Sequence, residues 1–331
     1  MRLLKKAGLA LTAVALLAGG TGTAAVAAPS SGRTVAEDCS HLYLLTDGRG
    51  RGLTGKTWDD AHTTVPAGAR TEKFLYMDGI VPGVHPHSLD ETRRVADPAL
   101  AKRVVDFHNA CPGSRITLVG YSFGALISGD ALELLAQKNE VPKNLLNGIL
   151  IADPRRAVAQ HPVHGPAGGI MSVAPDGPGM HTPGARDFKG IKVASICRED
   201  DVVCDAANPI SNAVAFTGEL QRLGDAHGDY GGGGGRNEPN YWANPAVAEN
   251  VGDLVLPAAP KRKLDWGGPA FPIPMPREIL NNNPVYKGVM DGLSQSGDAI
   301  AWAKVLDSFG LPGSKIVNGL WQIIEGAGAG W

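Results

Sequence analysis

The stretch Arg-Ile-Thr-Leu-Val-Gly-Tyr-Ser-Phe-Gly-Ala-Leu-Ile-Ser-Gly-Asp, residues 115–130, decides how this chain folds. Its first part, Ile116 to Val119, is apolar and rich in β-branched side chains, which predicts a buried strand. An apolar run with helix-compatible residues follows the stretch 120–124 and continues to about Gln137. Residues 120–124 read Gly-Tyr-Ser-Phe-Gly, a G-x-S-x-G sequence. Strand, G-x-S-x-G and helix in this order predict a nucleophile elbow, a sharp turn that presents the serine hydroxyl.

The two glycines of this turn have a physical purpose. The chain reverses so sharply between strand and helix that the positions flanking Ser122 have no room for a Cβ atom. Ser122 itself is expected at the N-terminus of the helix, where free amide groups and the helix dipole favour negative charge. A glycine-rich turn with an incidental serine would show the same five letters. The flanking strand and helix favour a nucleophile instead.

Other segments alternate between apolar strands and helical patterns. The predicted strands span residues 41–46, 73–77, 145–152 and 191–196, and the predicted helices span about 89–110, 213–223 and 246–256. Within the first helix, Asp97-Pro98 indicates a break or a new start. Residues 157–188 lack periodicity, and we interpret them as a long loop that forms a pocket wall. The alternation predicts an α/β fold with a mostly parallel central sheet.

The N-terminal segment has the features of a processing signal. Arg2, Lys5 and Lys6 precede an apolar run from Ala7 to Ala18, and Ala25-Val26-Ala27 fits an A-x-A cleavage site. We therefore expect export with cleavage near Ala27, so that residues 1–27 are a signal peptide and residues 28–37 a flexible leader. No other stretch is long and apolar enough to predict an integral membrane span.

Beyond the predicted domain, residues 38–256, the composition changes. Six prolines between Pro257 and Pro276 predict an extended linker over residues 257–276. Residues 277–331 show two amphipathic patterns and form an expected helical C-terminal extension. The apolar faces contain Val285, Val289 and Leu293 in one helix, and Ile316, Val317, Leu320, Trp321 and Ile324 in the other. Docking on the preceding domain is the favoured role, and contact with a partner or the cell envelope is the alternative.

Four cysteines remain in the expected mature chain, Cys39, Cys111, Cys197 and Cys204. An even number in an oxidising compartment predicts disulfides, for which three pairings are open. No C-x-x-C or H-E-x-x-H spacing occurs, so we predict no metal site. The pair His85 and His87 has no cluster of other ligands beside it and is interpreted as part of a solvated loop.

Nucleic acids and dinucleotides are not expected ligands. The formal net charge of the 331 residues is −2, which gives no electrostatic argument for nucleic acid. Gly50, Gly52 and Gly55 form a G-x-G-x-x-G sequence, and Asp78 lies at a suitable distance downstream for a ribose contact. The segment after Gly55 has no helical apolar face, however, so we interpret this loop as a chance match and predict no cofactor.

A serine nucleophile needs a base that takes its proton and an acid that orients the base. In α/β hydrolases these groups follow one another in the order Ser, Asp or Glu, His. Downstream of Ser122, Asp201 follows a predicted strand, and His227 lies in a loop flanked by glycines. Several alternatives stay open, namely Asp153, Asp200 and Glu199 for the acid, and His161, His164 and His181 for the base.

Four motifs connect this chain with a known family. They are Cys111-Pro112 before the elbow strand, Gly120-Tyr121-Ser122-x-Gly124-Ala125, Cys197-x-x-x-Asp201-x-Val203-Cys204, and His227-x-x-Tyr230 followed by glycine. With these motifs, residues 39–256 resemble cutinase-type serine esterases, specifically the secreted cutinase-like hydrolases of actinobacteria, with similarity to the related PE-PPE hydrolase domain. The resemblance implies a cutinase-like α/β-hydrolase fold, a three-layer sandwich around the parallel sheet.

The resemblance also implies roles for individual residues. By the family's pattern, Cys39 pairs with Cys111 and Cys197 pairs with Cys204. Ser122 is then the nucleophile, Asp201 the acid and His227 the base. The oxyanion hole is expected at the Phe123 N–H and at the segment Gly48-Arg49.

Two departures from the family's pattern concern the oxyanion hole. The residue after the nucleophile is usually Gln, and this chain has Phe123, which keeps the backbone N–H and makes the wall of the pocket more apolar. After the first strand the family has Gly-Ser or Gly-Thr, where this chain has Gly48-Arg49. A backbone amide there could suffice, Arg49 could contribute charge, or the hole could be incomplete, at a cost of about 100- to 1,000-fold in rate.

The resemblance implies a secreted enzyme that hydrolyses carboxylic esters through an acyl-serine intermediate, without metal or cofactor. The expected substrates have lipid-like, polyester or short-chain acyl groups. The alternative is a non-catalytic binding protein of the cell envelope on a hydrolase scaffold, which contacts partners through residues 257–331.

Overall fold

The computed structural model describes residues 37–80, 87–161, 165–199, 201–208, 215–216, 219, 223–232 and 237–258. The predicted signal peptide and the helical C-terminal extension lie outside these residues. So do the leader, apart from Glu37, and the linker, apart from Pro257 and Ala258. None of the helices in the described part of the chain has the length and apolar content needed to cross a membrane.

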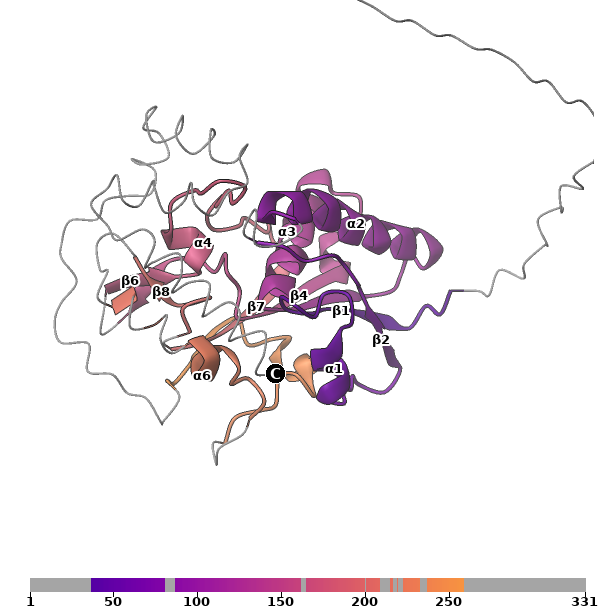
Figure 1. The fold of residues 1–331 in the computed structure, drawn as a ribbon. Helices are drawn as coiled ribbons and strands as arrows, with labels where there is room; N and C mark the ends of the chain where they lie inside the picture. Colours follow the sequence, from indigo (N-terminus) through magenta and orange to yellow (C-terminus); the bar gives the residue numbers. More distant parts are fainter. Residues whose placement is uncertain are drawn as a thin grey trace, which may run out of the picture. The chain divides into compact units, whose positions relative to one another are not determined.

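A six-stranded parallel sheet forms the centre of the fold (Figure 1). Its strands are β1 (His41–Thr46), β2 (Ala69–Lys73), β3 (Ile116–Tyr121), β4 (Leu146–Ile151), β7 (Lys192–Arg198) and β9 (Asp253–Leu256). They lie in the order β2-β1-β3-β4-β7-β9, and every pair of neighbours is parallel. The middle strands β3 and β4 are buried on both faces, which is why they read as continuous apolar runs in the sequence. The predicted α/β class with a mostly parallel sheet is confirmed.

Helices cover both faces of this sheet. The side chains of β1 show the division, because Leu42 and Leu44 belong to one apolar core and Tyr43 and Leu45 to another. The first core also contains residues of α2 (Leu89–Ala110) and α3 (Phe123–Lys138), which lie together in Figure 1. The second core contains Trp58 of α1 (Lys56–Asp60) and residues from the C-terminal part of the described chain. The described residues therefore form the expected three-layer arrangement.

Helix α2 does not break at Asp97-Pro98, contrary to our prediction. It begins at a capping box, in which the Ser88 side chain accepts from the Glu91 N–H and Glu91 accepts from the Ser88 N–H. It then continues through Pro98 to Ala110. Proline removes one hydrogen bond from a helix, but buried residues of α2 on both sides of Pro98 belong to the core that α2 shares with α3 and the sheet, and this packing offsets the loss.

Two predicted elements near the edges of the sheet were wrong. The second strand is Ala69–Lys73 rather than 73–77, because this edge strand is polar and gives little apolar signal. The segment 246–256 forms no long helix. A short 3₁₀ helix, η2 (Pro245–Ala248), precedes strand β9, which pairs with β7. Arg156, a buried residue, bonds to both carboxylate oxygens of Asp253 in β9, so contacts distant in sequence decide this strand.

The segment 157–188, predicted as an irregular loop, contains regular structure. It includes β5 (Ala159–His161), β6 (Gly165–Gly168) and α4 (Ile170–Val173). The strand β6 lies between β5 and β8 (Ala206–Ala207) in a small antiparallel sheet. These strands consist mainly of Gly, Ala and Pro, so they have no alternation of apolar and polar side chains from which to predict them. The predicted helix 213–223 lies mostly outside the described residues.

A buried network of ion pairs connects Arg186, in the segment 157–188, with helices α2 and α3. The Asp130 carboxylate on α3 accepts from Arg186 at 2.7 Å, from Arg155 at 2.6 Å and from Arg93 of α2 at 2.7 Å. Arg186 also donates to Asp153 at 2.5 Å, just after β4. Burial alone would raise the pKa of Asp130, but the surrounding guanidinium groups lower it to about 2. Asp130 is thus a fixed negative charge at the centre of the network.

The neighbouring Asp97 carboxyl has the opposite behaviour. Burial, followed by the repulsion of the Asp130 carboxylate, raises the pKa of Asp97 to about 9. Between about pH 4 and pH 9 the folded protein therefore holds a proton that the unfolded chain has released. The free energy of unfolding falls as the pH rises through this window, because the unfolded state binds fewer protons.

Asp97→Asn should remove this penalty. From pH 5 to pH 8 the stability of the variant should increase relative to wild type, by at most about 1.4 kcal/mol per pH unit. Chemical denaturation of both proteins across this range measures the difference. Asp106→Asn is the control, because Asp106 is an exposed carboxylate of the same helix that pairs with Lys102. A difference between Asp97→Asn and wild type that stays constant with pH would contradict the assignment.

Candidate active site

The G-x-S-x-G sequence forms the expected turn between strand and helix. Strand β3 ends at Tyr121 and helix α3 begins at Phe123. Ser122 lies between them with φ 57° and ψ −123°, a backbone conformation that costs a residue with a side chain of order 1–3 kcal/mol. Its N–H donates to the Ile151 carbonyl of β4 at 2.8 Å. A Cβ atom on Gly124 would overlap the carbonyl oxygens of Thr46 and Asp47, so glycine is required there.

Three predicted residues meet beside this turn. His227, the last residue of α6 (Leu223–His227), has its Nε2 atom 2.7 Å from the Ser122 Oγ. Its Nδ1 atom lies 3.1 Å and 3.0 Å from the two carboxylate oxygens of Asp201. The Asp201 side chain is 0% exposed and the His227 side chain 16% exposed. The structure thus places serine, imidazole and carboxylate in a continuous hydrogen-bonded chain.

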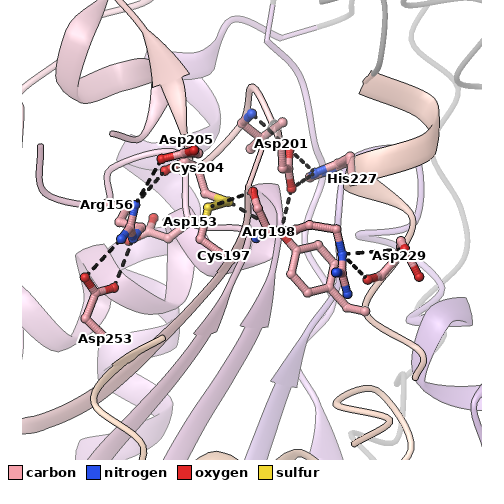
Figure 2. Close-up of a disulfide and its surroundings, with 12 residues drawn as sticks. Asp153, Arg156, Cys197, Arg198, Asp201, Cys204, Asp205, His227, Asp229 and Asp253 are labelled. Carbon is pink, nitrogen blue, oxygen red and sulfur yellow. Dashed lines mark hydrogen bonds and ion pairs between the residues drawn. A yellow bond between two sulfur atoms is a disulfide. The ribbon is translucent and has the colours of Figure 1, made fainter. Parts of the chain in front are cut away.

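A disulfide loop holds Asp201 in place. Cys197, near the end of β7, forms a disulfide with Cys204, which is seven positions later in the sequence. Asp201 lies in the loop between these two cysteines. Figure 2 shows Asp201 beside this disulfide and directed toward His227. The Cys204 N–H donates to the Asp201 carbonyl at 3.0 Å and the Val203 N–H donates to its Oδ1 at 3.0 Å. The loop therefore fixes both the backbone and the side chain of Asp201.

The alternative acids and bases have other partners or lie outside the described residues. Asp153 accepts from Arg186 and from the Arg155 N–H, and burial raises its pKa. Glu199 accepts from the Ala258 N–H. His181 bonds to Asp176 at 2.9 Å and its side chain is 61% exposed. Asp200, His164 and the side chain of His161 lie outside the description. None of Asp153, Glu199 and His181 is bonded to Ser122 or His227 in the described part of the chain.

Two segments flank Ser122 where an oxyanion would form. Phe123 is the first residue of α3, and its N–H meets no acceptor among the described residues. On the other side Gly48 lies so close that a Cβ atom there would be 3.2 Å from the Ser122 Cβ. The Gly48 N–H already donates to the Asp47 carboxylate at 2.6 Å. Arg49 follows directly, and burial lowers the pKa of its guanidinium, opposed by the Asp78 carboxylate.

Two carboxylates hold the loop after β1, a role that the sequence did not predict for either of them. Asp47, whose pKa burial raises, accepts from the Gly48 N–H and from the Thr57 N–H at 2.8 Å. Asp78 accepts from the Gly50 N–H at 2.5 Å and from the Gly52 N–H at 3.3 Å. The residue that resembles a ribose ligand in the sequence thus binds the glycine-rich loop itself. An aspartate directly after a buried strand was the available signal for Asp47.

Ser122 lies between two aromatic residues, Tyr121 and Phe123. Tyr76 is buried and its ring lies 5.9 Å from that of Phe123, while its hydroxyl donates to the Asp47 carbonyl at 2.6 Å. On the histidine side, the Tyr121 ring stacks on His227 with 5.2 Å between ring centroids, and its hydroxyl donates to the His227 carbonyl at 2.7 Å. Among the described residues no group of three or more His, Cys, Asp or Glu side chains is arranged to hold a metal ion.

Comparison with known proteins agrees with the motifs. The sequence model of the family Cutinase matches residues 64–222. Residues 64–222 thus match the cutinase family. The resemblance predicted from the elbow and cysteine motifs is therefore confirmed. Within the cutinase-family region lie Ser122 and Asp201, whereas His227 follows it by five residues and Gly48 precedes it, so flanking segments complete the site.

A relative and two solved structures share this similarity. The "Carboxylesterase Culp6 homolog" of Corynebacterium glutamicum is 31% identical over 144 residues, which are 38% of this chain and 47% of that protein. The chain thus spans about half the length of this curated relative. A cutinase-like protein from Cryptococcus sp. is 19% identical, with a TM-score of 0.36, and the match covers 52% of this chain and 83% of that one. The catalytic core domain of acetyl xylan esterase from Trichoderma reesei is 20% identical, with a TM-score of 0.33, over 57% of this chain and 97% of that one.

The two disulfides of the described chain are Cys39–Cys111 and Cys197–Cys204, the pairing that the resemblance implies. No cysteine is left free. Disulfides of this kind are typical of proteins that mature in an oxidising compartment. Cys111 is the C-cap of α2, and Cys39 lies two residues before β1, so this first disulfide joins two elements of the sheet and helix layers.

The strained backbone of Ser122 leads to a prediction about stability. Ser122→Gly should be more stable than Ser122→Ala, by up to about 2 kcal/mol, because glycine tolerates a positive φ and alanine does not. Both variants lack the hydroxyl, so the comparison isolates the backbone. Thermal or chemical denaturation measures the difference. If Ser122→Ala proves equal or superior in stability, the backbone of the elbow carries no such strain.

Proposed function

We propose that this chain is a secreted serine esterase that hydrolyses carboxylic esters through an acyl-serine intermediate. The observation that carries the proposal is the bonded chain from Ser122 Oγ through the His227 ring to the Asp201 carboxylate. In this mechanism His227 takes the proton of Ser122 while Oγ attacks the ester carbonyl, and Asp201 holds the imidazole and stabilises its positive charge. His227 then gives the proton to the leaving alcohol, and a water molecule releases the acid by the same steps in reverse order.

The tetrahedral intermediate needs donors for its negative oxygen. We assign this role to the Phe123 N–H and to the Gly48-Arg49 segment on the other side of Ser122. The helix dipole of α3, a helix of 16 residues, adds favourable potential at the same place. The Gly48 N–H donates to the Asp47 carboxylate, and we propose its neighbour Arg49 as the source of the second donor to the oxyanion. Gly48 contributes by the absence of a side chain, which would crowd Ser122.

The proposed substrate class is taken from the family resemblance. The buried rings of Phe123 and Tyr76, which pack on each other next to the nucleophile in the fold, are compatible with an apolar acyl group. Lipid-like, polyester or short-chain acyl esters are the proposed substrates. Secretion, with cleavage of a signal peptide near Ala27, is proposed from the sequence, and the two disulfides support an oxidising destination. For residues 277–331 we retain docking on the domain, or envelope contact, as the proposed role.

A serine-directed fluorophosphonate probe tests the function. It should label the full chain and not Ser122→Ala, and turnover of p-nitrophenyl butyrate should fall by at least about 1,000-fold in this variant. Ser195→Ala is the matched control, because the Ser195 hydroxyl is buried and makes no hydrogen bond to any described residue that the change could remove. Equal labelling of wild type and Ser122→Ala would overturn the assignment. A folded wild type that neither reacts with the probe nor hydrolyses the ester would favour the non-catalytic binding protein.

The two disulfides should separate activity from stability. Cys197→Ser/Cys204→Ser should cost about 2.5 kcal/mol of stability and most of the kcat, because this short loop carries Asp201. Cys39→Ser/Cys111→Ser should cost about 4 kcal/mol, since it frees a loop of sequence separation 72, and leave kcat nearly unchanged in the folded fraction. The variant that loses more stability is thus expected to lose less activity. Denaturation curves and ester turnover, measured on both variants, test this expectation. The same ranking in both measurements would refute it.

A further inference from the structure

Tyr230 contacts the Asp201 carboxylate, which also bonds to His227. Its side chain is fully buried, and its hydroxyl donates to Asp201 Oδ2 at 2.7 Å. The same hydroxyl oxygen accepts from the Arg198 N–H at 2.9 Å. A tyrosine hydroxyl has one proton. Because the Arg198 amide occupies the acceptor side, this proton is directed at the carboxylate.

The Asp201 carboxylate is held at both oxygens. The Val203 N–H donates to Oδ1 at 3.0 Å, and Tyr230 donates to Oδ2. His227 Nδ1 lies at nearly equal distances from the two oxygens, so the plane of the carboxylate faces the imidazole. Rotation of the carboxylate about its Cβ–Cγ bond would break the bonds to Val203 and Tyr230 together. Val203 donates through its backbone N–H and Tyr230 through its side chain, so of these two donors only the Tyr230 hydroxyl can be removed by a substitution.

The surroundings keep Tyr230 in this position and in this protonation state. The guanidinium of buried Arg198 lies 5.8 Å from the Tyr230 ring centroid and pairs with Glu238 at 2.6 Å. Its Nε donates to the Asp229 carbonyl at 2.8 Å, next to Tyr230 in the chain. Burial, followed by the Asp201 carboxylate, raises the pKa of Tyr230 well above its usual range. The hydroxyl therefore remains a donor throughout the range in which a serine esterase would work.

We propose that Tyr230 is a positioning residue for the reaction, which acts through Asp201 to hold the His227 ring in the tautomer and orientation that accept the Ser122 proton. The inference rests on the proposed function. Without this hydroxyl, Oδ2 of a fully buried carboxylate keeps only the His227 ring as a donor, and the carboxylate can turn out of the plane that faces Nδ1. The base would then lose its orientation while the elbow and the buried pair Phe123 and Tyr76 stay as they are.

Tyr230→Phe in the full chain tests the proposal. We expect kcat for p-nitrophenyl butyrate to fall about 10- to 100-fold, the range that hydrogen bonds to charged groups support, while KM changes less than about twofold. Tyr241→Phe is the matched control, because Tyr241 is buried in the same apolar core and its hydroxyl bonds to none of Ser122, Asp201 and His227. It should keep wild-type kcat. The value of kcat is calculated per active site, and active sites are counted by the amount of fluorophosphonate bound when labelling is complete. A partly unfolded sample therefore does not give a falsely low kcat.

A double-mutant cycle separates positioning from a structural role. If Tyr230 acts through Asp201, Tyr230→Phe should lower kcat less than about twofold in the background of Asp201→Asn, where the carboxylate is already absent. The same fold-loss in both backgrounds, or a kcat of Tyr230→Phe within twofold of wild type, would overturn the inference. These failures differ from failure of the proposed function, in which wild type itself shows neither labelling nor turnover.

Discussion

A negative charge without solvent contact is the constraint on which the rest of the candidate site depends. The Asp201 carboxylate is 0% exposed, and a carboxylate in such a place is stable only with hydrogen-bond donors at its oxygens. The imidazole of His227, the hydroxyl of Tyr230 and the N–H of Val203 supply them. Since these donors come from different segments, the position of Asp201 requires the loop 197–204, the helix α6 and the residues after it to be folded together. The short disulfide makes this loop rigid.

The second buried carboxylate, Asp130, solves the same problem with arginines. Three guanidinium groups, from Arg93, Arg155 and Arg186, surround it, and the segment that contains Arg186 is bound through it to α2 and α3. Ion pairs of this kind add little net stability compared with an apolar core, but removing one partner leaves an uncompensated charge. Here they join Arg155 and Arg186 to helices α2 and α3. Asp130 and Asp201 thus each bind together residues that are distant in the sequence.

On the oxyanion side the arrangement differs from the pattern that the family resemblance implies. Phe123 follows the nucleophile and packs on Tyr76, and the loop after β1 has Arg49 in place of a hydroxyl-bearing residue. Carboxylates bind the amides of this loop, Asp47 at its start and Asp78 from the segment after β2. These charge-assisted hydrogen bonds hold the loop close to Ser122. The residue of the loop nearest to Ser122 is Gly48, which has no side chain to crowd the serine. Phe123 and Arg49 are thus the two positions at which this candidate site departs from the pattern that the family resemblance implies.

The sequence by itself determined the elements whose signals are local. Residues 116–138 contain a buried strand, a turn that needs glycine and an apolar helix, and each depends only on neighbours in the chain. The cysteine spacing around Asp201 is local in the same sense, which is why the family resemblance could name the disulfides and the residues that the structure brings together. The helix at 89–110 was also predictable, although Pro98 wrongly indicated a break, because its long apolar face outweighs one missing hydrogen bond.

Only the tertiary structure decided the features that depend on distant partners. Strand β9 exists because β7 offers an open edge and Arg156 binds Asp253, and nothing in residues 246–256 alone indicates this. Strand β2 is polar because it lies at the other edge. The choice of Asp201 over Asp153 was open from the order of residues, and it is Arg186 that occupies Asp153. Tyr230 and Asp201 are 29 positions apart in the sequence. The sequence showed Tyr230 as part of a motif, but only the fold shows that its hydroxyl bonds to Asp201.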